Sequence, residues 1–426
     1  MLVYVLNQHG EPLMPCSPRK ARLLLRNNKA TLHKRTPFTI QLCAGSSGYK
    51  QPITLGVDAG SKHIGLSACT AERELYAEEL TPRNDVVELM STRREFRQAR
   101  RNRKTRYRQP RFYNRVRSKH KGWLAPSVEV KIQEHVTAIK RVVGILPIQR
   151  IVVETAEFDM QRLQAMLAGN PLPVGTDYQL GAQYDEYNVR QYVLKRDNYT
   201  CQCCGAHNTA KTRVKFHIHH LESRKTGGNA PDNLITLCKH CHDAIHRGLI
   251  LLPTKRRGRP LRDAAFMGIM RKTLVERLRR EVAVPVHETY GYITKYLREK
   301  YNISKSLLND ARCVAKAPLA KPLTYYYQSK AVRHHNRQLH QATALKGGAR
   351  KFNQSPLYVH GFRLFDKVRY EDTECFVWGR RATGYFLLKT LNGEKVADGV
   401  KHTKLTLLER SVNYLISIRR RTAPLP

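Results

Sequence analysis

Acidic residues are scarce in this sequence. Only 34 Asp and Glu stand against 76 Lys and Arg among 426 residues, so the formal net charge is +42 with histidine neutral. Charged residues make up 26% of the chain, an ordinary fraction, so the imbalance lies in the sign alone. Such a chain repels itself unless a polyanion neutralises it, which argues against an enzyme of free small molecules. The charge predicts nucleic acid as the partner, ahead of an anionic membrane surface.

Long apolar runs are also missing. No stretch of the sequence approaches the roughly 18 apolar residues that a membrane span needs. The start, MLVYVLNQHGEPLMP, has no basic segment ahead of its short apolar stretch, so it predicts a strand and a turn rather than a signal peptide. Apolar residues make up 41% of the chain, enough for real cores, and the length of 426 residues suggests two to four domains. We expect a cytoplasmic protein without membrane contact.

The ten cysteines are unevenly spread, and five of them fall between positions 201 and 241. Their spacing predicts two knuckles, Cys201-x-x-Cys204 and Cys238-x-x-Cys241, which together suit one tetrahedral Zn²⁺. Clustered pairs in a large basic chain indicate a reducing compartment rather than a disulfide framework. A site closed by four thiolates has no open position, so its zinc is expected to be structural. The alternative is that these are buried free cysteines.

Histidines follow a strand–loop–strand–helix pattern between and just after the knuckles. His242 and His246 are four residues apart on the expected helix, so they face the same side and can share a metal. His219 and His220 are neighbours on a strand and cannot both point the same way, so one is expected to bind metal while the other activates water. Asn233 is expected to orient that base or to brace the loop. The alternative is a zinc ribbon whose histidines only contact DNA.

This segment, roughly residues 190–250, closely resembles an HNH (ββα-metal) endonuclease with an added zinc ribbon. The double histidine, the Asn 13 residues later and the His nine beyond that carry the resemblance. The resemblance implies that His220 is the general base and that His219 and His242 bind Mg²⁺. It also makes His246 a candidate third ligand.

Three carboxylates stand out because acids are rare elsewhere. Asp58 ends TLGVD, Glu154 ends RIVVE and Asp310 lies in SLLNDARCVA. An apolar setting disfavours a lone carboxylate unless it is paired or metal-bound. If the three converge, they can hold two Mg²⁺ ions about 4 Å apart for phosphodiester hydrolysis. The strand-like pieces at 54, 150 and 284 are therefore expected to form one interrupted sheet, although each acid could instead be a solvated or capping carboxylate.

The motifs GVDAGSKHIGLS, IVVETAEF and NDARCVA resemble the three split motifs of a RuvC-type (RNase H-like) nuclease. By that resemblance, Asp58, Glu154 and Asp310 occupy the metal-binding positions. Leu307 departs from the pattern, because relatives usually carry a histidine three residues before the last Asp. Leucine neither binds metal nor transfers a proton, so cutting by this site is expected to be slow, altered or lost. His287 on the preceding strand is one residue that could compensate.

Positions 93–121 contain 14 Lys and Arg and one acid. The spacing predicts a helix that ends at Gln109, because Pro110 discourages its continuation. Aromatic residues then interleave with arginine, which suits base stacking together with phosphate contact. The alternatives are a solvated face or a disordered tail. The residues expected to bind nucleic acid are Arg93, Arg94, Arg97, Arg100, Arg101, Arg103, Lys104, Arg106, Arg108 and Arg111.

The order of these segments resembles the IscB family, transposon-encoded RNA-guided DNA endonucleases related to CRISPR type II effectors. The tetrapeptide Pro12-Leu13-Met14-Pro15 is typical of their N-terminal domain. The resemblance implies an α/β multidomain fold, in which a RuvC fold is split by an Arg-rich bridge helix and a zinc-containing HNH insertion. The implied domains are PLMP (1–52), RuvC part I (53–82), bridge helix region (83–125), RuvC part II (126–185), HNH with zinc ribbon (186–252), linker and RuvC part III (253–320), and a basic β-rich C-terminal domain (321–426).

By this resemblance the chain is a monomeric protein in a prokaryotic ribonucleoprotein with a guide RNA (ωRNA), and it cleaves double-stranded DNA. The HNH domain cuts the guide-paired strand and the RuvC domain cuts the displaced strand, both with Mg²⁺. The C-terminal domain contacts the guide RNA and a target-adjacent motif, because in such systems base pairing reads the sequence and protein reads the adjacent motif. Two alternatives stay open: an unguided HNH DNA endonuclease, and a nuclease-derived RNA- or DNA-binding regulator with an impaired RuvC site.

Overall fold

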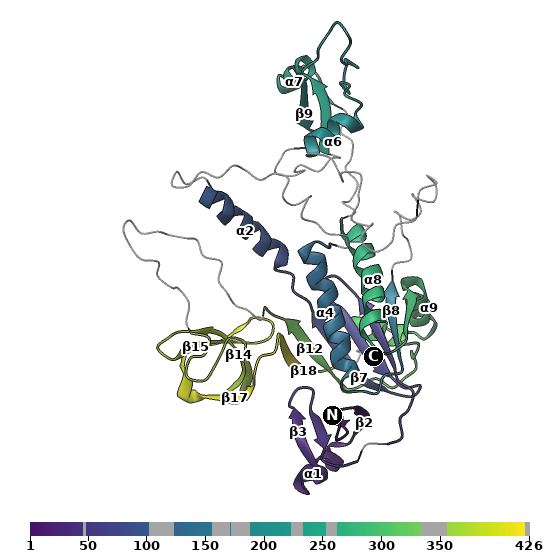
Figure 1. The fold of residues 1–426 in the computed structure, drawn as a ribbon, viewed down its shortest axis with the longest axis vertical. Coiled ribbons are helices and arrows are strands. Elements are labelled where there is room, and N and C mark those ends of the chain that lie inside the picture. Colours follow the sequence, from purple (N-terminus) through teal and green to yellow (C-terminus); the bar gives the residue numbers. More distant parts are fainter. Residues whose placement is uncertain are drawn as a thin grey trace. The chain divides into compact units, whose positions relative to one another are not determined.

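The computed structural model describes residues 1–45, 48–101, 123–155, 171, 188–222, 233–252, 262–333 and 356–421. The chain forms two compact units (Figure 1). One unit combines Met1–Gly175 with Phe266–Pro426, and the other is Thr176–Ala265. The second unit is therefore an insertion in the first. Within the described ranges, no helix is both long and apolar enough to cross a membrane.

The N-terminal residues form a four-stranded sheet in the order β2-β1-β4-β3 with one helix. The PLMP tetrapeptide lies in β2, an edge strand, where proline leaves no ladder hydrogen bond unmade. Ser17 caps the helix by accepting a hydrogen bond from the Lys20 backbone N–H. The elements are β1 (Val3–Leu6), β2 (Pro12–Cys16), α1 (Pro18–Arg26), β3 (Ala30–Lys34) and β4 (Thr39–Leu42).

A seven-stranded sheet in the order β11-β8-β5-β6-β7-β12-β18 is the centre of the first unit. Strands β5, β8 and β11 pair in parallel although long segments separate them in the sequence, which confirms the prediction of one interrupted sheet. Strand β6 returns antiparallel beside β5, as a short Gly-containing turn favours. The strands are β5 (Thr54–Ala59), β6 (Ile64–Cys69), β7 (Glu74–Thr81), β8 (Arg150–Thr155), β11 (Val286–Tyr290), β12 (Tyr325–Ala331) and β18 (Tyr414–Arg420).

Helices cover both faces of this sheet. On one face α10 packs so closely on β5 and β6 that Gly56 and Gly65 are required, because a Cβ on Gly56 would overlap the Ala311 carbonyl oxygen. On the opposite face, Arg141 of α4 forms an ion pair with Glu78 of β7. Helices α4 and α8 lie side by side (Figure 1), and Arg277 joins them through a bidentate contact with Glu129. The helices are α2 (Val86–Arg101), α4 (Pro126–Val143), α8 (Arg262–Glu281), α9 (Gly291–Lys300) and α10 (Leu307–Val314).

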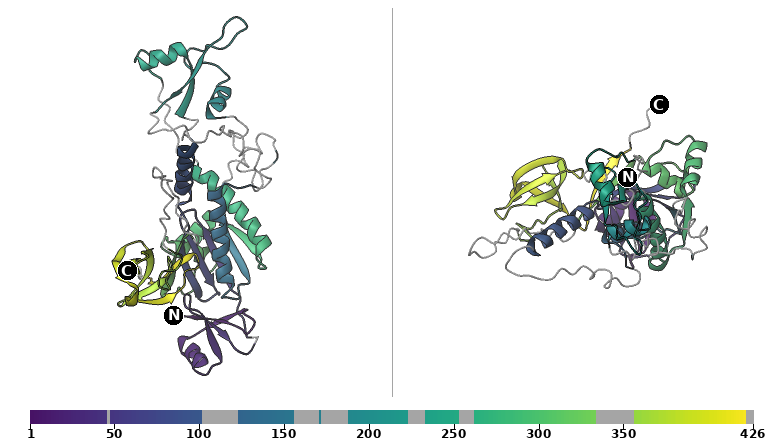
Figure 2. Two further views of the ribbon diagram at one scale, coloured as in Figure 1. Left: turned by 60° about the vertical axis from the view of Figure 1, so that its left-hand side comes forward. Right: turned by 90° about the horizontal axis from the view of Figure 1, so that it is seen from above.

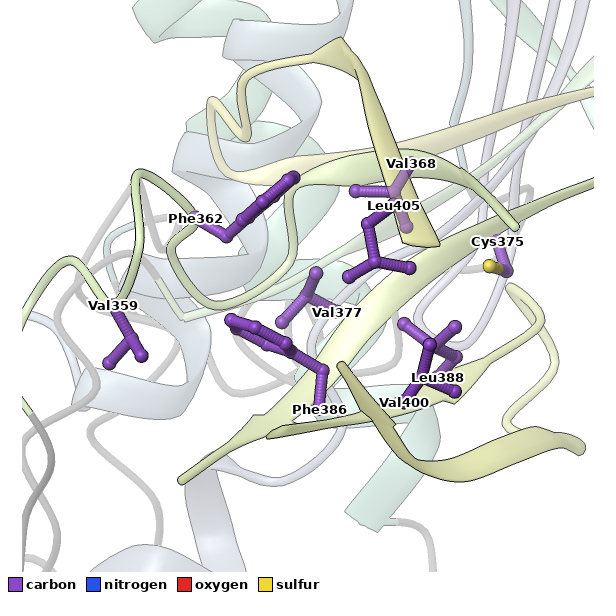
Figure 3. Close-up of a cluster of buried hydrophobic side chains, with 9 residues drawn as sticks. All are labelled: Val359, Phe362, Val368, Cys375, Val377, Phe386, Leu388, Val400 and Leu405. Carbon is purple, nitrogen blue, oxygen red and sulfur yellow. The ribbon is translucent and has the colours of Figure 1, made fainter. Parts of the chain in front are cut away.

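A strongly curved five-stranded sheet follows in the C-terminal part (Figure 2). Its apolar core is shown in Figure 3, where the rings of Phe362 and Phe386 meet edge to face with centroids 5.5 Å apart. The expected C-terminal domain of 321–426 is divided between sheets, because β12 pairs with β7 and carries β18 into the central sheet. The strands of the curved sheet are β13 (Lys367–Tyr370), β14 (Thr373–Arg380), β15 (Tyr385–Lys389), β16 (Lys395–Lys401) and β17 (Leu405–Glu409), with a short 3-10 helix, η3 (His402–Lys404).

The second unit is built on an antiparallel pair of strands followed by a helix, the ββα order that the sequence predicts. Its small core consists of apolar residues and cysteines, among them Phe216 and Leu237. Asn188 caps the first helix by accepting from the Gln191 backbone N–H. The elements are α6 (Val189–Arg196), β9 (Phe216–His220), β10 (Leu234–Cys238) and α7 (Lys239–His246).

Candidate functional site

The four predicted cysteines come together in the second unit. Ligand atoms of Cys201, Cys204, Cys238 and Cys241 all lie within 4.8 Å of one another. The Sγ atoms of Cys204 and Cys238 are 3.8 Å apart, which matches the roughly 3.8 Å expected between thiolates bound tetrahedrally at about 2.3 Å from zinc. Cys203, the spare thiol of the first knuckle, is exposed and outside this group. The donor set and spacing therefore fit a structural Zn²⁺.

Local backbone geometry prepares the cysteine group for a cation. Cys238 is the N-cap of α7, and its Sγ accepts a hydrogen bond from the Cys241 backbone N–H at 3.4 Å. Burial raises the pKa of the Cys201 thiol, but backbone hydrogen bonds within the knuckles outweigh burial and lower that pKa to about 7. The thiolate is the form that binds metal, so this lowering of the pKa favours binding at Cys201. The pKa values of Cys204 and Cys241 are raised instead, that of Cys241 mainly by burial.

Three histidines from strand β9 and helix α7 form a second candidate metal-binding group in the ββα unit. Ligand atoms of His219, His242 and His246 lie within 4.8 Å of one another, and Nε2 of His242 is 3.3 Å from Nε2 of His246. Burial, and then the neighbouring His246 and His242, lower the pKa of His219. Neutral imidazole is the metal-binding form, so these three side chains fit a divalent cation at neutral pH.

His217 is a member of this cluster that the sequence analysis missed. Its ring stacks on that of His242 with centroids 5.0 Å apart, and its buried Nε2 has no hydrogen-bond partner within the described part of the chain. His217 precedes His219 by two residues on β9, and period-two alternation puts both on the face toward α7. That periodicity is the signal that would have found it.

His220 and Asn233 occupy different positions from the cluster. Strand alternation directs His220 to the opposite face of β9 from His219, as expected for neighbouring residues. Asn233 is buried, and its side chain bonds the backbone of Glu222 twice, accepting from the N–H at 2.8 Å and donating to the carbonyl at 3.3 Å. The amide of Asn233 thus braces the turn that follows His220.

The three carboxylates converge on one face of the central sheet. Val57 pairs with Val153 in the parallel β5–β8 ladder, so the next residues, Asp58 and Glu154, point to the same face. That is the face that α10 covers, and α10 carries Asp310. Gly65 pairs with Asp58 across β5 and β6. A Cβ at Gly65 would lie only 2.5 Å from the Leu307 carbonyl oxygen, so glycine is needed for α10 to pack this closely. The glycines therefore bring Asp310 toward the strand carboxylates.

The electrostatics of this carboxylate site are strongly perturbed. Burial, and then the charges of Glu154 and Asp310, raise the pKa of Asp58 to about 7. Burial also raises the pKa of Asp310, against the lowering effect of Arg298. Mutual repulsion of buried carboxylates is what a cation relieves, so the donor set fits Mg²⁺. The three acids are nevertheless less tightly grouped than the cysteines or histidines, since their ligand atoms are not all within 4.8 Å.

Two arginines and a threonine contact these acids, and the sequence analysis missed all three. Arg298 of α9 places Nε 2.6 Å from Asp310 Oδ1, an ion pair without good hydrogen-bond alignment. Arg271 of α8 lies 3.8 Å from Glu154, and Thr294 donates a hydrogen bond to the same carboxylate at 2.8 Å. No local motif marks these residues, because they reach the site through helix packing.

Leu307 is the first residue of α10, one turn before Asp310. The charged side chain beside Asp310 is that of Arg298. It comes from α9, whereas the histidine usual in relatives would stand at position 307 in α10. His287 is exposed on β11, two residues before the strand position that pairs with Glu154. The compensating residue suggested by the sequence is thus not the one that contacts the acids.

The arginine-rich segment is only partly within the described residues. Helix α2 begins at Val86, seven residues before Arg93, the first residue of the arginine-rich segment, and is described to Arg101. On this helix the side chains of three predicted contacts are exposed: Arg93, Arg94 and Arg97. The structure does not describe the side chains of Arg100 and Arg101. The remaining predicted nucleic-acid contacts also lie outside the described residues: Arg103, Lys104, Arg106, Arg108 and Arg111.

Comparison with protein families gives two matches. Residues 3–181 match the RRXRR protein family, and residues 201–248 match the HNH endonuclease family. A probable HNH endonuclease of Lactococcus phage SK1 is 41% identical over 59 residues, covering 13% of this chain and 62% of that protein. Anaredoxin from Nostoc sp. is 30% identical over 74 residues, covering 17% of this chain and 91% of that protein.

Longer proteins match over smaller shares of their length. Zorya protein ZorE from Escherichia coli is 26% identical over 105 residues, and the chain spans about a quarter of it, covering 24% of ZorE and 25% of this chain. A crystal structure of Streptococcus thermophilus Cas9 in complex with the GGAA PAM has 13% identity and a TM-score of 0.31, covering 55% of this chain and 31% of that one. A TM-score this low does not define a common fold.

The ββα unit, its histidine cluster and the HNH match define the class of protein as a nuclease of the HNH type. The HNH domain is joined to an RRXRR segment in the same chain. Together, the two matches support an IscB-like nuclease.

Proposed function

We propose that this chain is an RNA-guided endonuclease of double-stranded DNA with one nuclease site in each unit. The observation that carries the proposal is the pairing, in one strongly basic chain, of a histidine cluster on a ββα unit with a three-carboxylate site on a separate sheet. Two sites with different ligands suit two strands of opposite polarity. The guide RNA, the target-adjacent motif and the monomeric state are implied by the resemblance to the IscB family and are part of the proposal.

In the ββα unit, His219 and His242 would hold Mg²⁺, with His246 as the third ligand. The bound cation would grip the scissile phosphate and stabilise the leaving oxygen. His220, the last residue of β9, would accept the proton of the attacking water, and Asn233 would hold the turn after it. The cysteine group would fix the start of α7 through a structural Zn²⁺, and so the positions of two histidines on that helix. This site would cut the guide-paired strand.

The central sheet would act on the displaced strand. Its order β11-β8-β5-β6-β7, with β6 antiparallel to its neighbours, supports assignment to the RNase H-like (RuvC) fold, with parts at 53–82, 126–185 and 253–320. Asp58, Glu154 and Asp310 would hold Mg²⁺ there, and Thr294 and Arg271 would orient Glu154. Arg298 would compete with a cation for Asp310, which would slow this site. The bridge region 83–125 and the C-terminal 321–426 would grip the RNA.

Strand-specific cleavage tests this proposal. The chain would be co-expressed with its RNA and given duplex DNA labelled differently on each strand. His220→Ala should abolish the cut in the guide-paired strand and leave binding intact, while Asp58→Ala should remove only the cut in the other strand. Retention of the guide-paired cut by His220→Ala would contradict the base assignment. Equal plasmid cutting by RNA-free protein would instead indicate an unguided endonuclease.

The Arg298–Asp310 ion pair and Leu307 favour a second candidate, in which the carboxylate site binds but does not cut. The wild type would then nick only the guide-paired strand. Leu307→His should restore the second cut if the missing imidazole is the cause, and Leu307→Met is the matched control of similar volume. If the protein binds RNA tightly but gives no Mg²⁺-dependent cleavage product on either strand, it would instead be a nuclease-derived regulator that binds RNA or DNA without cutting.

A further inference from the structure

A cavity of about 270 Å³ lies where three separate parts of the first unit meet. Lys34 at the end of β3 contributes one wall, Thr137 and Arg141 of α4 another, and C-terminal residues the rest. None of its lining residues belongs to the two candidate metal sites. A volume of this size equals that of about nine water molecules at roughly 30 Å³ each, so it is large enough for a group of nucleobase size.

The walls of this cavity are largely apolar and partly aromatic. Phe365 and Ile416 line it, and the Arg141 guanidinium lies over the Tyr414 ring at 4.2 Å from the centroid. Val412, at the rim, is 70% exposed. Flat aromatic and guanidinium surfaces are the surfaces on which unstacked bases settle, and this preference depends little on sequence.

Cations outnumber anions around the cavity. Its lining includes four basic residues and one acid, Glu409. Arg141, Lys367 and Arg410 each have a carboxylate partner, whereas Lys34 forms no ion pair with any carboxylate in the described part of the chain. Burial, and then the charge of Arg141, lower the pKa of Lys34. The charges of Glu409 and Glu78 only partly offset this effect, and a phosphate beside Lys34 would add a further counter-charge.

Hydrogen-bond donors at the same place lack acceptors. Nε and Nη1 of Arg141 are buried and have no hydrogen-bond partner among the residues that the structure describes. Buried donors of this kind are rare in folded proteins, and an acceptor that enters the cavity is one group that would satisfy them. Nucleobases carry carbonyl and ring-nitrogen acceptors that can accept from Arg141. Their flat faces also suit the apolar walls of the cavity.

We propose that this cavity binds one unstacked nucleotide from a single-stranded segment, with its base between the apolar walls and its phosphate beside Lys34. The inference rests on the proposed nucleic-acid partner and adds a site to it. A bound RNA and a single DNA strand present the same chemistry, and the two arms of the test separate them.

The test is photo-crosslinking of the full chain. In one arm the protein is purified with RNA labelled by 4-thiouridine, and in the other it is given single-stranded DNA containing 5-iododeoxyuridine. After irradiation, peptides joined to nucleotide are identified by mass spectrometry. The expected result is a crosslink on peptides containing Phe365 or Tyr414 in one arm. Lys34→Gln should lower the yield of that crosslink about tenfold, Lys34→Arg should retain it, and crosslinks elsewhere should be unchanged in both.

Two results would overturn the inference: crosslinks that appear elsewhere but not at these peptides in either arm, or a yield that Lys34→Gln leaves unchanged. The first would leave the proposed nuclease function standing. Protein that crosslinks here but cuts neither strand would refute the nuclease function and support the nucleotide site. Thermal unfolding of both Lys34 variants checks that they fold as the wild type does.

Discussion

Gly56 and Gly65 set the distance between α10 and the central sheet. Each faces the helix from a strand, and a methyl group at Gly56 would overlap the Ala311 carbonyl oxygen. The helix cannot retreat locally without carrying Asp310 away from Asp58. These two glycines are therefore as necessary to the carboxylate site as its acids, although neither contacts metal or substrate.

Gly56→Ala should lower the free energy of unfolding by about 1–3 kcal/mol, because the added methyl group overpacks the strand–helix contact. It should also weaken any cut made by the carboxylate site while sparing the histidine site. The measurement is chemical denaturation together with strand-specific cleavage. Gly268→Ala in α8 is the control, since its Cβ would meet no atom within 4 Å; alanine there should stabilise by up to about 1 kcal/mol. Equal effects at the two glycines would refute the packing argument.

At the scale of elements, the second unit depends on its cysteines, because its apolar core is small. Cys204→Ser should abolish stoichiometric zinc and unfold this unit, since a structural zinc contributes on the order of 10 kcal/mol. The first unit should keep its own thermal transition. Zinc content by a colorimetric assay and unfolding by calorimetry are the measurements. Cys203→Ser should bind zinc normally, because Cys203 lies outside the four-cysteine group; zinc loss in both variants would contradict the assignment.

Helix α4 carries a carboxyl group whose burial makes stability depend on pH. Burial raises the pKa of Glu134 from 4.5 to about 7, although the Arg83 backbone N–H donates to it. The folded chain then holds a proton that the unfolded chain releases, so the contribution of Glu134 to stability is complete below pH 4.5 and disappears as pH rises through about 7.

Glu134→Gln should therefore gain stability over the wild type as pH rises across that window, by at most about 3 kcal/mol. The comparison must be a difference between variants, because burial lowers the pKa of the adjacent His135 to about 4, and His135 makes stability rise with pH instead. Denaturation of both proteins at several pH values is the measurement. A constant difference between them would show that Glu134 does not titrate there.

At the scale of the whole molecule, the net charge of +42 makes nucleic-acid affinity steeply dependent on salt. Replacing Arg93, Arg94 and Arg97 of α2 by Gln should reduce the slope of log affinity against log salt by about 0.9 for each phosphate that these arginines neutralise. Binding titrations at several salt concentrations give this slope. Replacing the exposed Arg19, Lys20 and Arg22 of α1 is the matched control and should leave it nearly unchanged. Equal reductions in slope would mean that only total charge matters.

Local spacing was the part of the site that the sequence predicted best. Cys201-x-x-Cys204, Cys238-x-x-Cys241 and the four-residue interval from His242 to His246 each lie within one turn or knuckle, and the structure brings each set together. Arg298 could not be predicted in the same way, because its contact with Asp310 depends on how α9 packs beside α10. His217 was within reach of strand periodicity but was overlooked.

The sequence also predicted the interrupted sheet, because β5 and β8 are apolar runs that must be buried and β11 follows as a third strand-like piece. It did not predict that β12 and β18 extend that sheet, since hydrogen bonding at a sheet edge leaves no mark in either strand. The resemblance implies a C-terminal boundary at 321, and the pairing of β12 with β7 crosses it.

By itself, the sequence determined the sign of the charge, the ligand types and the spacing of ligands within each short element. These follow from residue chemistry and from the fixed periods of helix and strand. Tertiary structure alone decided that Asp58 and Glu154 share a face with Asp310, that arginines neutralise two of these acids, and that three distant segments enclose a cavity. Such contacts join residues far apart in the chain, so they depend on how whole elements pack rather than on any local pattern.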